Sequence, residues 1–282
     1  MEPTDALDAI GQLPDVEIDL AGAALQLARI DAPEADWRAA SAHLTALARE
    51  AVAAARDLPS GTAAARAGAL ASLLGRHGYG GDTATYEDPA NANLIRVIER
   101  RRGLPVSLGI LWLHCTRAAG WPAYGLDFPG HFLLAVEGRE TSGPAPHPVS
   151  RVVLDVFSGG AMLTNRSLLN LLRRTEGAAA ELRPGVLQPM SARAVLLRLQ
   201  RNIQLRRQDS GALEPALVCT QDMLRIAPET VSLWRDSALL HERLGHVADA
   251  LKCHARVLDI VPEGELALQT KRAMDGLRSR LN

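Results

Sequence analysis

Apolar residues recur at helical spacing through most of the N-terminal part of the chain. An apolar run at residues 21–30 predicts a short helix, and the spacing of leucine and alanine predicts further helices at 35–56 and 64–77. A glycine-rich segment at 78–81 then interrupts the pattern. We therefore expect residues 1–82 to form a helical N-terminal region packed on the core.

The best-marked helix of the chain lies between Pro105 and Gly120. Proline suits the first turn of a helix, where its missing N–H would have no partner anyway, and glycine is typical of a helix end. The residues between them are almost all apolar, so we expect this helix to be buried on most sides. Ser107 is expected at or beside its N-terminal cap.

A small sheet is predicted directly after this helix. Residues 124–128 and 131–136 read as strands joined by a Pro-Gly turn, and residues 152–157 read as a further strand. The segment 139–150, rich in proline, glycine and serine, is predicted to be a loop. A buried helix followed by a small antiparallel sheet indicates an α+β core, which we place at residues 83–185.

The C-terminal third, residues 190–282, contains an internal repeat of 34 residues. This is the period of the tetratricopeptide helix pair, and a Leu-Gly dipeptide before Ala250 matches its turn. The positions that recur are Ala216, Leu217, Leu224, Ile226 and Pro228, matched by Ala250, Leu251, Leu258, Ile260 and Pro262. We expect tetratricopeptide-like helical hairpins attached to the core.

Composition narrows the class of protein further. A net charge of −1 gives no overall attraction to nucleic acid or to an anionic membrane. No apolar stretch approaches the roughly 20 residues that span a bilayer, and the acidic N-terminus does not resemble a secretory signal. The three cysteines are widely separated and form no disulfide framework. These features predict a cytoplasmic protein that binds neither nucleic acid nor membrane.

Three residues carry the possible chemistry. Ser107 starts a helix, where unpaired N–H groups can stabilise an oxyanion. His131 enters a strand and could accept the proton of a serine hydroxyl, and Asp155 lies in a second strand where it could orient an imidazole. The three together predict a catalytic triad in the order nucleophile, base, acid.

Each of these residues also has a purely structural interpretation. Serine near a helix start is most often a cap, and His131 could be a core histidine bonded to a carbonyl. Asp155 is harder to set aside, because a carboxylate in an apolar strand needs a partner and His131 could provide it.

Other polar residues give weaker signals. The basic run Glu99 to Arg102 reads as a solvated helix end, with binding of an anion or acidic partner as the alternative. Cys115, inside the apolar helix, reads as an inert buried thiol. The histidines and cysteines show no metal-ligand spacing and no phosphate-binding glycine loop is present, so no metal or cofactor is predicted.

At these residues the chain resembles the SirB-type bacterial family of the transglutaminase-like superfamily. The matching segments are Tyr86-Glu87-Asp88-Pro89, Asn91-Ala92-Asn93-Leu94, Gly103-Leu104-Pro105-Val106-Ser107-Leu108, Pro129-Gly130-His131-Phe132-Leu133 and Asp155-Val156-Phe157 with Gly159-Gly160. The resemblance implies a papain-like core and a C-terminal segment of tetratricopeptide-like helices. It matches Ser107, His131 and Asp155 to nucleophile, base and acid, although active members use cysteine as the nucleophile.

Three functions follow. The first is a degenerate, non-catalytic transglutaminase-like module that binds a protein or peptide, helped by the helical repeats. The second is a hydrolase or acyltransferase acting on amide or ester bonds through Ser107, His131 and Asp155. The third is a scaffold in which the trio is a hydrogen-bonded core element. We place the binding module first, because serine stands where the resemblance implies a thiol.

Overall fold

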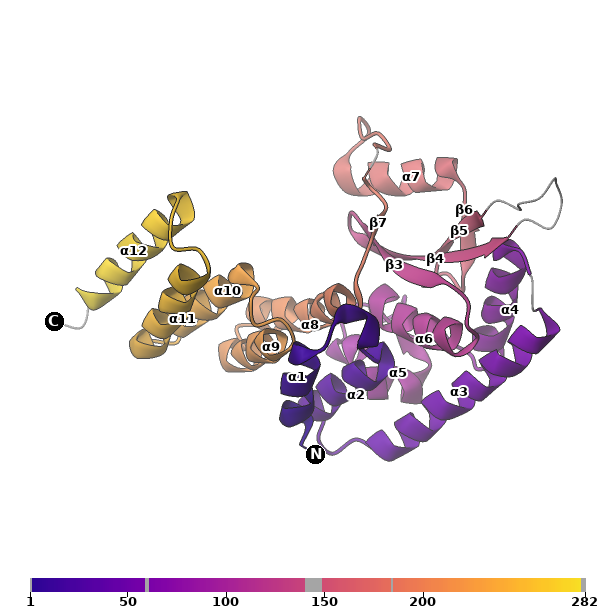
Figure 1. The fold of residues 1–282 in the computed structure, drawn as a ribbon, viewed down its shortest axis with the longest axis horizontal. Coiled ribbons are helices and arrows are strands. Elements are labelled where there is room, and N and C mark those ends of the chain that lie inside the picture. Colours follow the sequence, from indigo (N-terminus) through magenta and orange to yellow (C-terminus); the bar gives the residue numbers. More distant parts are fainter. Residues whose placement is uncertain (1, 59–60, 140–148, 184, 280–282) are drawn as a thin grey trace. The chain divides into compact units, whose positions relative to one another are not determined.

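The computed structural model describes residues 2–58, 61–139, 149–183 and 185–279. These residues form two compact units. The core unit comprises residues 14–196, and the repeat unit comprises the described residues of 1–13 and 197–282. The predicted α+β class is confirmed, with a small antiparallel sheet among the helices of the core unit and paired helices at the C-terminal end (Figure 1).

The core unit contains both helices and strands. Its helices are η1 (Asp15–Glu17), α2 (Leu20–Asp31), α3 (Trp37–Asp57), α4 (Ala63–Arg76), η2 (Pro89–Ala92), α5 (Leu94–Arg100), α6 (Pro105–Ala118) and α7 (Asn165–Glu176), where η marks a 3-10 helix. Its strands are β1 (Gly80–Gly81), β2 (Arg102–Gly103), β3 (Ala123–Phe128), β4 (His131–Arg139), β5 (Val149–Asp155), β6 (Ala161–Leu163) and β7 (Gln188–Pro189). The helix α8 (Ala192–Asp209) begins in this unit and continues into the repeat unit.

The main sheet has the strand order β6-β5-β4-β3-β7, and all its pairs are antiparallel. The predicted hairpin is present, because Phe128 pairs with His131 across the Pro-Gly turn. Of the predicted loop at 139–150, residues 140–148 lie outside the described residues, while Val149 and Ser150 begin β5. The remaining short strands, β1, β2, β6 and β7, are too brief for a period-two pattern to predict.

The two faces of the sheet have different partners. On one face, Leu133 and Val153 form a hydrophobic cluster with leucines of α7. On the other face, the ring of Phe132 lies against Gly109 of α6, so closely that a Cβ at Gly109 would be 2.1 Å from the ring. Figure 1 shows α7 on one side of the sheet and α6 with the N-terminal helices on the other. Alternation along β4 therefore decides which layer each side chain meets.

The sequence signals for α6 are confirmed with one difference. Pro105 is its first residue, and nine of its fourteen residues are buried, as the apolar run predicted. The cap is Leu104, which makes no side-chain capping bond, and Ser107 is the third residue of the helix. The predicted position of Ser107 at the cap is therefore displaced by one turn.

The repeat unit contains most of α8, the helices α9 to α12 and the first helix of the chain, α1 (Pro3–Gln12). Its other helices are α9 (Leu213–Ile226), α10 (Val231–Arg243), α11 (Val247–Ile260) and α12 (Glu265–Arg278). The prediction that all of residues 1–82 pack on the core differs from the structure at α1, which packs on α9. An ion pair of 2.6 Å between Asp8 and Arg225 links the two helices. Such a contact depends on residues far apart in the sequence, which local patterns do not reveal.

Candidate functional site

Ser107 lies completely inside the core unit. Its side chain is 0% exposed, and its hydroxyl donates to the carbonyl oxygen of Asn91 at 2.7 Å and to that of Leu104 at 2.9 Å. The Asn91 carbonyl also accepts the N–H of Leu104 at 2.9 Å. The hydroxyl therefore connects the first turn of α6 to the short helix η2, and its proton is directed to backbone oxygen.

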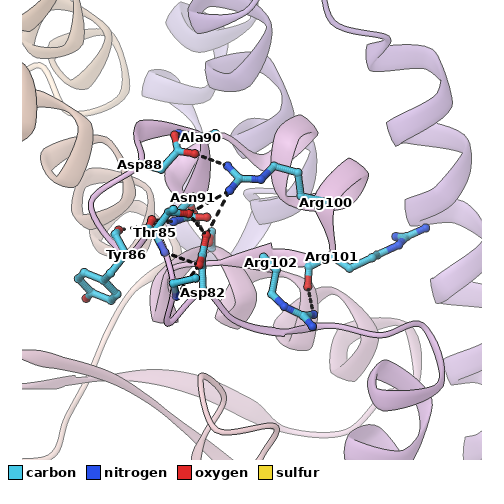
Figure 2. A network of polar contacts seen from close by, with 11 residues as sticks. Asp82, Thr85, Tyr86, Asp88, Ala90, Asn91, Arg100, Arg101 and Arg102 are labelled. Atoms are coloured by element: carbon cyan, nitrogen blue, oxygen red, sulfur yellow. Dashed lines mark hydrogen bonds and ion pairs between the residues drawn. The ribbon is translucent and has the colours of Figure 1, made fainter.

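A polar network follows directly from Asn91 (Figure 2). Asn91 is 0% exposed, and its Nδ2 donates to the carbonyl of Thr85 at 2.7 Å. Asp82, itself only 5% exposed, accepts the N–H of Thr85 at 2.8 Å and the Thr85 hydroxyl at 2.7 Å. These bonds hold the pKa of Asp82 down at about 2, because they stabilise the charged carboxylate.

The arginines of the run before β2 each take a partner within the core unit. Arg100 donates from Nη1 to Asp88 at 2.7 Å and from Nη2 to Asp82 at 3.2 Å. Arg102 donates to the carbonyl of Gly78 at 2.6 Å. Both arginines are exposed, in keeping with the predicted solvated helix end. Their guanidinium groups also connect α5 to the loop at 82–88, as Figure 2 shows for Arg100, and β2 to the turn after α4.

The low pKa of Asp82 predicts an acid-dependent loss of stability. Because its pKa is about 2 in the folded protein, against the ordinary value of 3.8 for a free carboxyl, ionisation of Asp82 stabilises the fold above about pH 4. That contribution is lost as the pH falls from about 4 towards 2. Asp82→Asn should therefore lower the urea midpoint at pH 7, and its difference from wild type should shrink towards pH 2. Asp57→Asn, at an exposed position on α3, is the control and should change the urea midpoint at pH 7 less than Asp82→Asn does.

His131 and Asp155 lie on neighbouring strands of the main sheet, at the start of β4 and the end of β5. His131 has the same parity along β4 as Leu133, and Asp155 has the same parity along β5 as Val153. Because Leu133 and Val153 pack against α7, the pleat directs His131 and Asp155 to that face. Thr175 of α7 also lies beside Gly130, directly before His131. The α6 layer, which holds Ser107, is on the opposite face.

The carboxylate of Asp155 is used by the turn that ends β5. Its Oδ1 accepts the N–H of Phe157 at 3.0 Å and that of Ser158 at 3.3 Å, and its Oδ2 accepts the hydroxyl of Ser158 at 2.8 Å. This is an Asx turn, in which a side-chain carboxylate satisfies the backbone of the following residues. Asp155 is thus hydrogen-bonded to groups of the turn after β5. Ser107 is hydrogen-bonded to backbone carbonyls near the start of α6.

A second polar cluster surrounds Arg101, which ends α5 in the left-handed conformation with φ 59. Its guanidinium donates to the hydroxyl of Tyr79 and lies 2.6 Å from Nε2 of His43. Burial, with the Arg101 charge second, lowers the pKa of His43 to about 4, and burial raises the pKa of Tyr79 to about 12. Burial also raises the pKa of Cys115 to about 12, which supports its interpretation as an inert thiol.

A cavity of about 360 Å³ in the core unit opens at the far end of α6 from Ser107. It is lined by Thr116 and Arg117 of α6, by residues before and at the start of α2, and by the first residues of β3. None of Ser107, His131 and Asp155 lines it. Within the described part of the chain, no three or more histidine, cysteine, aspartate or glutamate side chains are grouped as a metal site.

The fold and these contacts define a transglutaminase-like α+β domain followed by helical repeats. The family described as the transglutaminase-like superfamily matches residues 38–201, and the tetratricopeptide repeat family matches residues 200–275. The chain therefore belongs to the transglutaminase-like superfamily. Tetratricopeptide repeats indicate protein–protein interaction.

Bacterial relatives support this assignment. The chain is 32% identical over 231 residues to a UPF0162 protein of Pseudomonas aeruginosa, and the match covers 81% of this chain and 78% of that protein. It is 31% identical over 193 residues to a UPF0162 protein of Xylella fastidiosa, and it spans 66% of the length of that relative, just under two thirds. F-box only protein 21 of Homo sapiens is 27% identical over 65% of this chain but only 29% of its own length.

No solved structure matches the chain. Within the described residues, no helix is both long enough and apolar enough to cross a membrane.

Proposed function

We propose that this chain is a SirB-type transglutaminase-like protein in which the core domain is non-catalytic, and which binds a protein or peptide in the cytoplasm with the help of its tetratricopeptide repeats. One observation carries the non-catalytic part. The Ser107 hydroxyl is fully buried and donates its proton to the carbonyl of Asn91 at 2.7 Å. A serine nucleophile needs its proton directed to a base and its oxygen open to substrate.

Two further observations support the same proposal. The pleat directs His131 and Asp155 towards the α7 face, whereas Ser107 belongs to the α6 layer. The carboxylate of Asp155 also accepts hydrogen bonds from local groups, the N–H of Phe157 and the hydroxyl of Ser158. The binding part rests on the repeat family matched at residues 200–275.

The alternative, a serine hydrolase or acyltransferase using Ser107, His131 and Asp155, makes an opposite prediction for a covalent probe. A fluorophosphonate should label Ser107 if it is an activated nucleophile. We expect no labelling of the wild-type chain above the level of Ser107→Ala, with a serine protease as the positive control. Specific labelling of wild type that is lost in Ser107→Ala would overturn the non-catalytic proposal.

The binding part is tested separately. The full chain, immobilised through a tag, is used to select from a phage-displayed library of random peptides. We expect enriched sequences that bind the soluble chain with dissociation constants in the micromolar range, about −8 kcal/mol. Failure to enrich any sequence above a tag-only surface would contradict the binding proposal.

A further inference from the structure

The repeat unit contains a cavity of about 610 Å³ at the junction of α9, α10 and α11, with one wall supplied by α1. Its volume is within the range of pockets that hold small ligands or peptide side chains. The lining residues are Asp8, Gln12, Gln221, Leu224, Arg225, Pro228, Trp234, Ser237, His241 and Cys253. All of the lining residues belong to the repeat unit, so the cavity is a feature of that unit alone.

The wall contributed by α1 is held in place by two contacts. Asp8 of α1 pairs with Arg225 of α9 at 2.6 Å, and both residues line the cavity. Gly11 approaches α9 so closely that a Cβ there would lie 2.2 Å from the carbonyl oxygen of Arg225. The first helix is thus fitted to the repeat unit at a position where only glycine avoids a backbone clash.

One of the lining residues has a polar side chain whose hydrogen-bonding capacity is not fully used. His241 is 8% exposed, and its buried Nδ1 has no hydrogen-bond partner among the described residues. Ser237 lies one turn earlier on the same helix and accepts the thiol proton of Cys253 at 3.4 Å. A buried polar atom without a partner costs free energy in the unliganded protein.

The cavity is electrically neutral. Burial lowers the pKa of His241 and raises the pKa of Cys253, so at neutral pH both side chains are uncharged. Among the described residues that line it, only Asp8 and Arg225 are charged, and they pair with each other. An ionic ligand would lose its hydration here without meeting an unpaired opposite charge, so the site favours an uncharged group.

The residues that line the cavity favour an aromatic ligand. Leu224, Pro228 and the half-buried ring of Trp234 are apolar, and the Trp234 Nε1 donates to the Pro228 carbonyl at 2.7 Å, which fixes the orientation of the ring. A planar side chain can pack against such a surface over its whole length. A neutral imidazole presents one donor and one acceptor, and a phenol hydroxyl complements either.

From these features we infer that the cavity binds a tyrosine side chain of an extended partner peptide, with the phenol hydroxyl hydrogen-bonded to His241 and the ring against Trp234. This inference rests on the proposed binding function and adds to it a defined pocket and the residue that the pocket selects. The first helix of the chain takes part directly, because Asp8 and Gln12 of α1 line the pocket.

Peptides selected with the full chain test the inference. Each enriched peptide is made in two forms, with tyrosine and with phenylalanine at the shared position, and its affinity is measured by fluorescence anisotropy. Against wild-type protein, we expect loss of the phenol hydroxyl to weaken binding about 10-fold or more, because a site built to hydrogen-bond a hydroxyl rejects the analogue that lacks it. Against His241→Phe, the two forms should differ by less than about twofold, since the partner of the hydroxyl is gone.

The matched control is His246→Phe. His246 is an exposed histidine whose ring lies 5.7 Å from that of His241 and which does not line the cavity. It should keep the full preference for tyrosine. Thermal melting of both variants shows that the fold is intact, and the ¹⁵N shifts of the His241 ring nitrogens on adding N-acetyl-tyrosinamide report contact directly.

The outcomes separate the inference from the function on which it rests. If peptides bind but show no tyrosine preference, or if His241→Phe keeps that preference, the tyrosine pocket is wrong while peptide binding stands. If no peptide is enriched at all, both proposals fail. An unchanged His241 ring signal at saturating N-acetyl-tyrosinamide would also overturn the pocket assignment.

Discussion

Ser107→Cys should react with iodoacetamide at least about 100-fold more slowly than an exposed thiol, because reaction would require local opening costing roughly 3 kcal/mol or more. The side chain at this position is 0% exposed and directs its proton to the carbonyls of Asn91 and Leu104. Hydrogen bonding to carbonyl oxygen favours the neutral thiol over the thiolate, and burial acts in the same direction. Cys115, two turns further along the same helix, already has a pKa raised to about 12 by burial.

Ser72→Cys provides the exposed reference, since Ser72 lies on the surface of α4. The three native cysteines are all buried, so labelling is assigned to each site by mass spectrometry of the peptides. If the cysteine at position 107 reacts faster than the cysteine at position 72, and loses that rate in His131→Ala, the imidazole must activate it. The serine-enzyme alternative would then replace the non-catalytic proposal.

The sequence predicts helix α6 but not the direction of the Ser107 hydroxyl, and this difference has a physical basis. Pro105, Gly120 and the apolar run between them were enough to predict α6, because helix ends and burial are encoded locally. The direction of the Ser107 hydroxyl was not encoded in the same way. It depends on the carbonyl of Asn91, which reaches this helix through the turn at η2.

Asp155 has local partners that the strand pattern does not predict. Its carboxylate accepts hydrogen bonds from Phe157 and Ser158, two and three residues later. Aspartate followed by serine at that spacing is a turn signal that the sequence contained. The strand assignment through residue 157 hid it, because β5 ends at Asp155.

Asp82 and Arg100 could not have been connected from local patterns at all. They are separated by a loop, η2 and most of α5, and their 3.2 Å ion pair lies beside the pairing of β1 with β2. The same is true of α1, whose place on α9 depends on Gly11 and the Asp8–Arg225 pair. Periodicity finds elements, whereas such long-range polar contacts require knowledge of how the elements pack.

The packing of α6 on the sheet gives the largest expected effect on stability. An added methyl group at Gly109 would lie 2.1 Å from Cε1 of Phe132, a residue only 2% exposed in the core. Overpacking of this kind costs roughly 1–3 kcal/mol and occasionally more, whereas alanine normally stabilises a helix interior over glycine by about 1 kcal/mol. Because the contact is so short, we expect the steric cost to win, and Gly109→Ala should destabilise the core unit by about 2 kcal/mol.

Gly68→Ala is the matched control, since Gly68 lies inside α4 with nothing within 4 Å of an added Cβ. It should stabilise by up to about 1 kcal/mol, so the same substitution has opposite signs in two helices of one unit. Chemical denaturation followed by tryptophan fluorescence measures both, because three of the four tryptophans lie in the core unit. Phe132→Leu combined with Gly109→Ala should be less destabilised than the sum of the two single variants, since the smaller side chain relieves the clash. Strict additivity would mean that the Phe132 ring does not set the distance between α6 and β4.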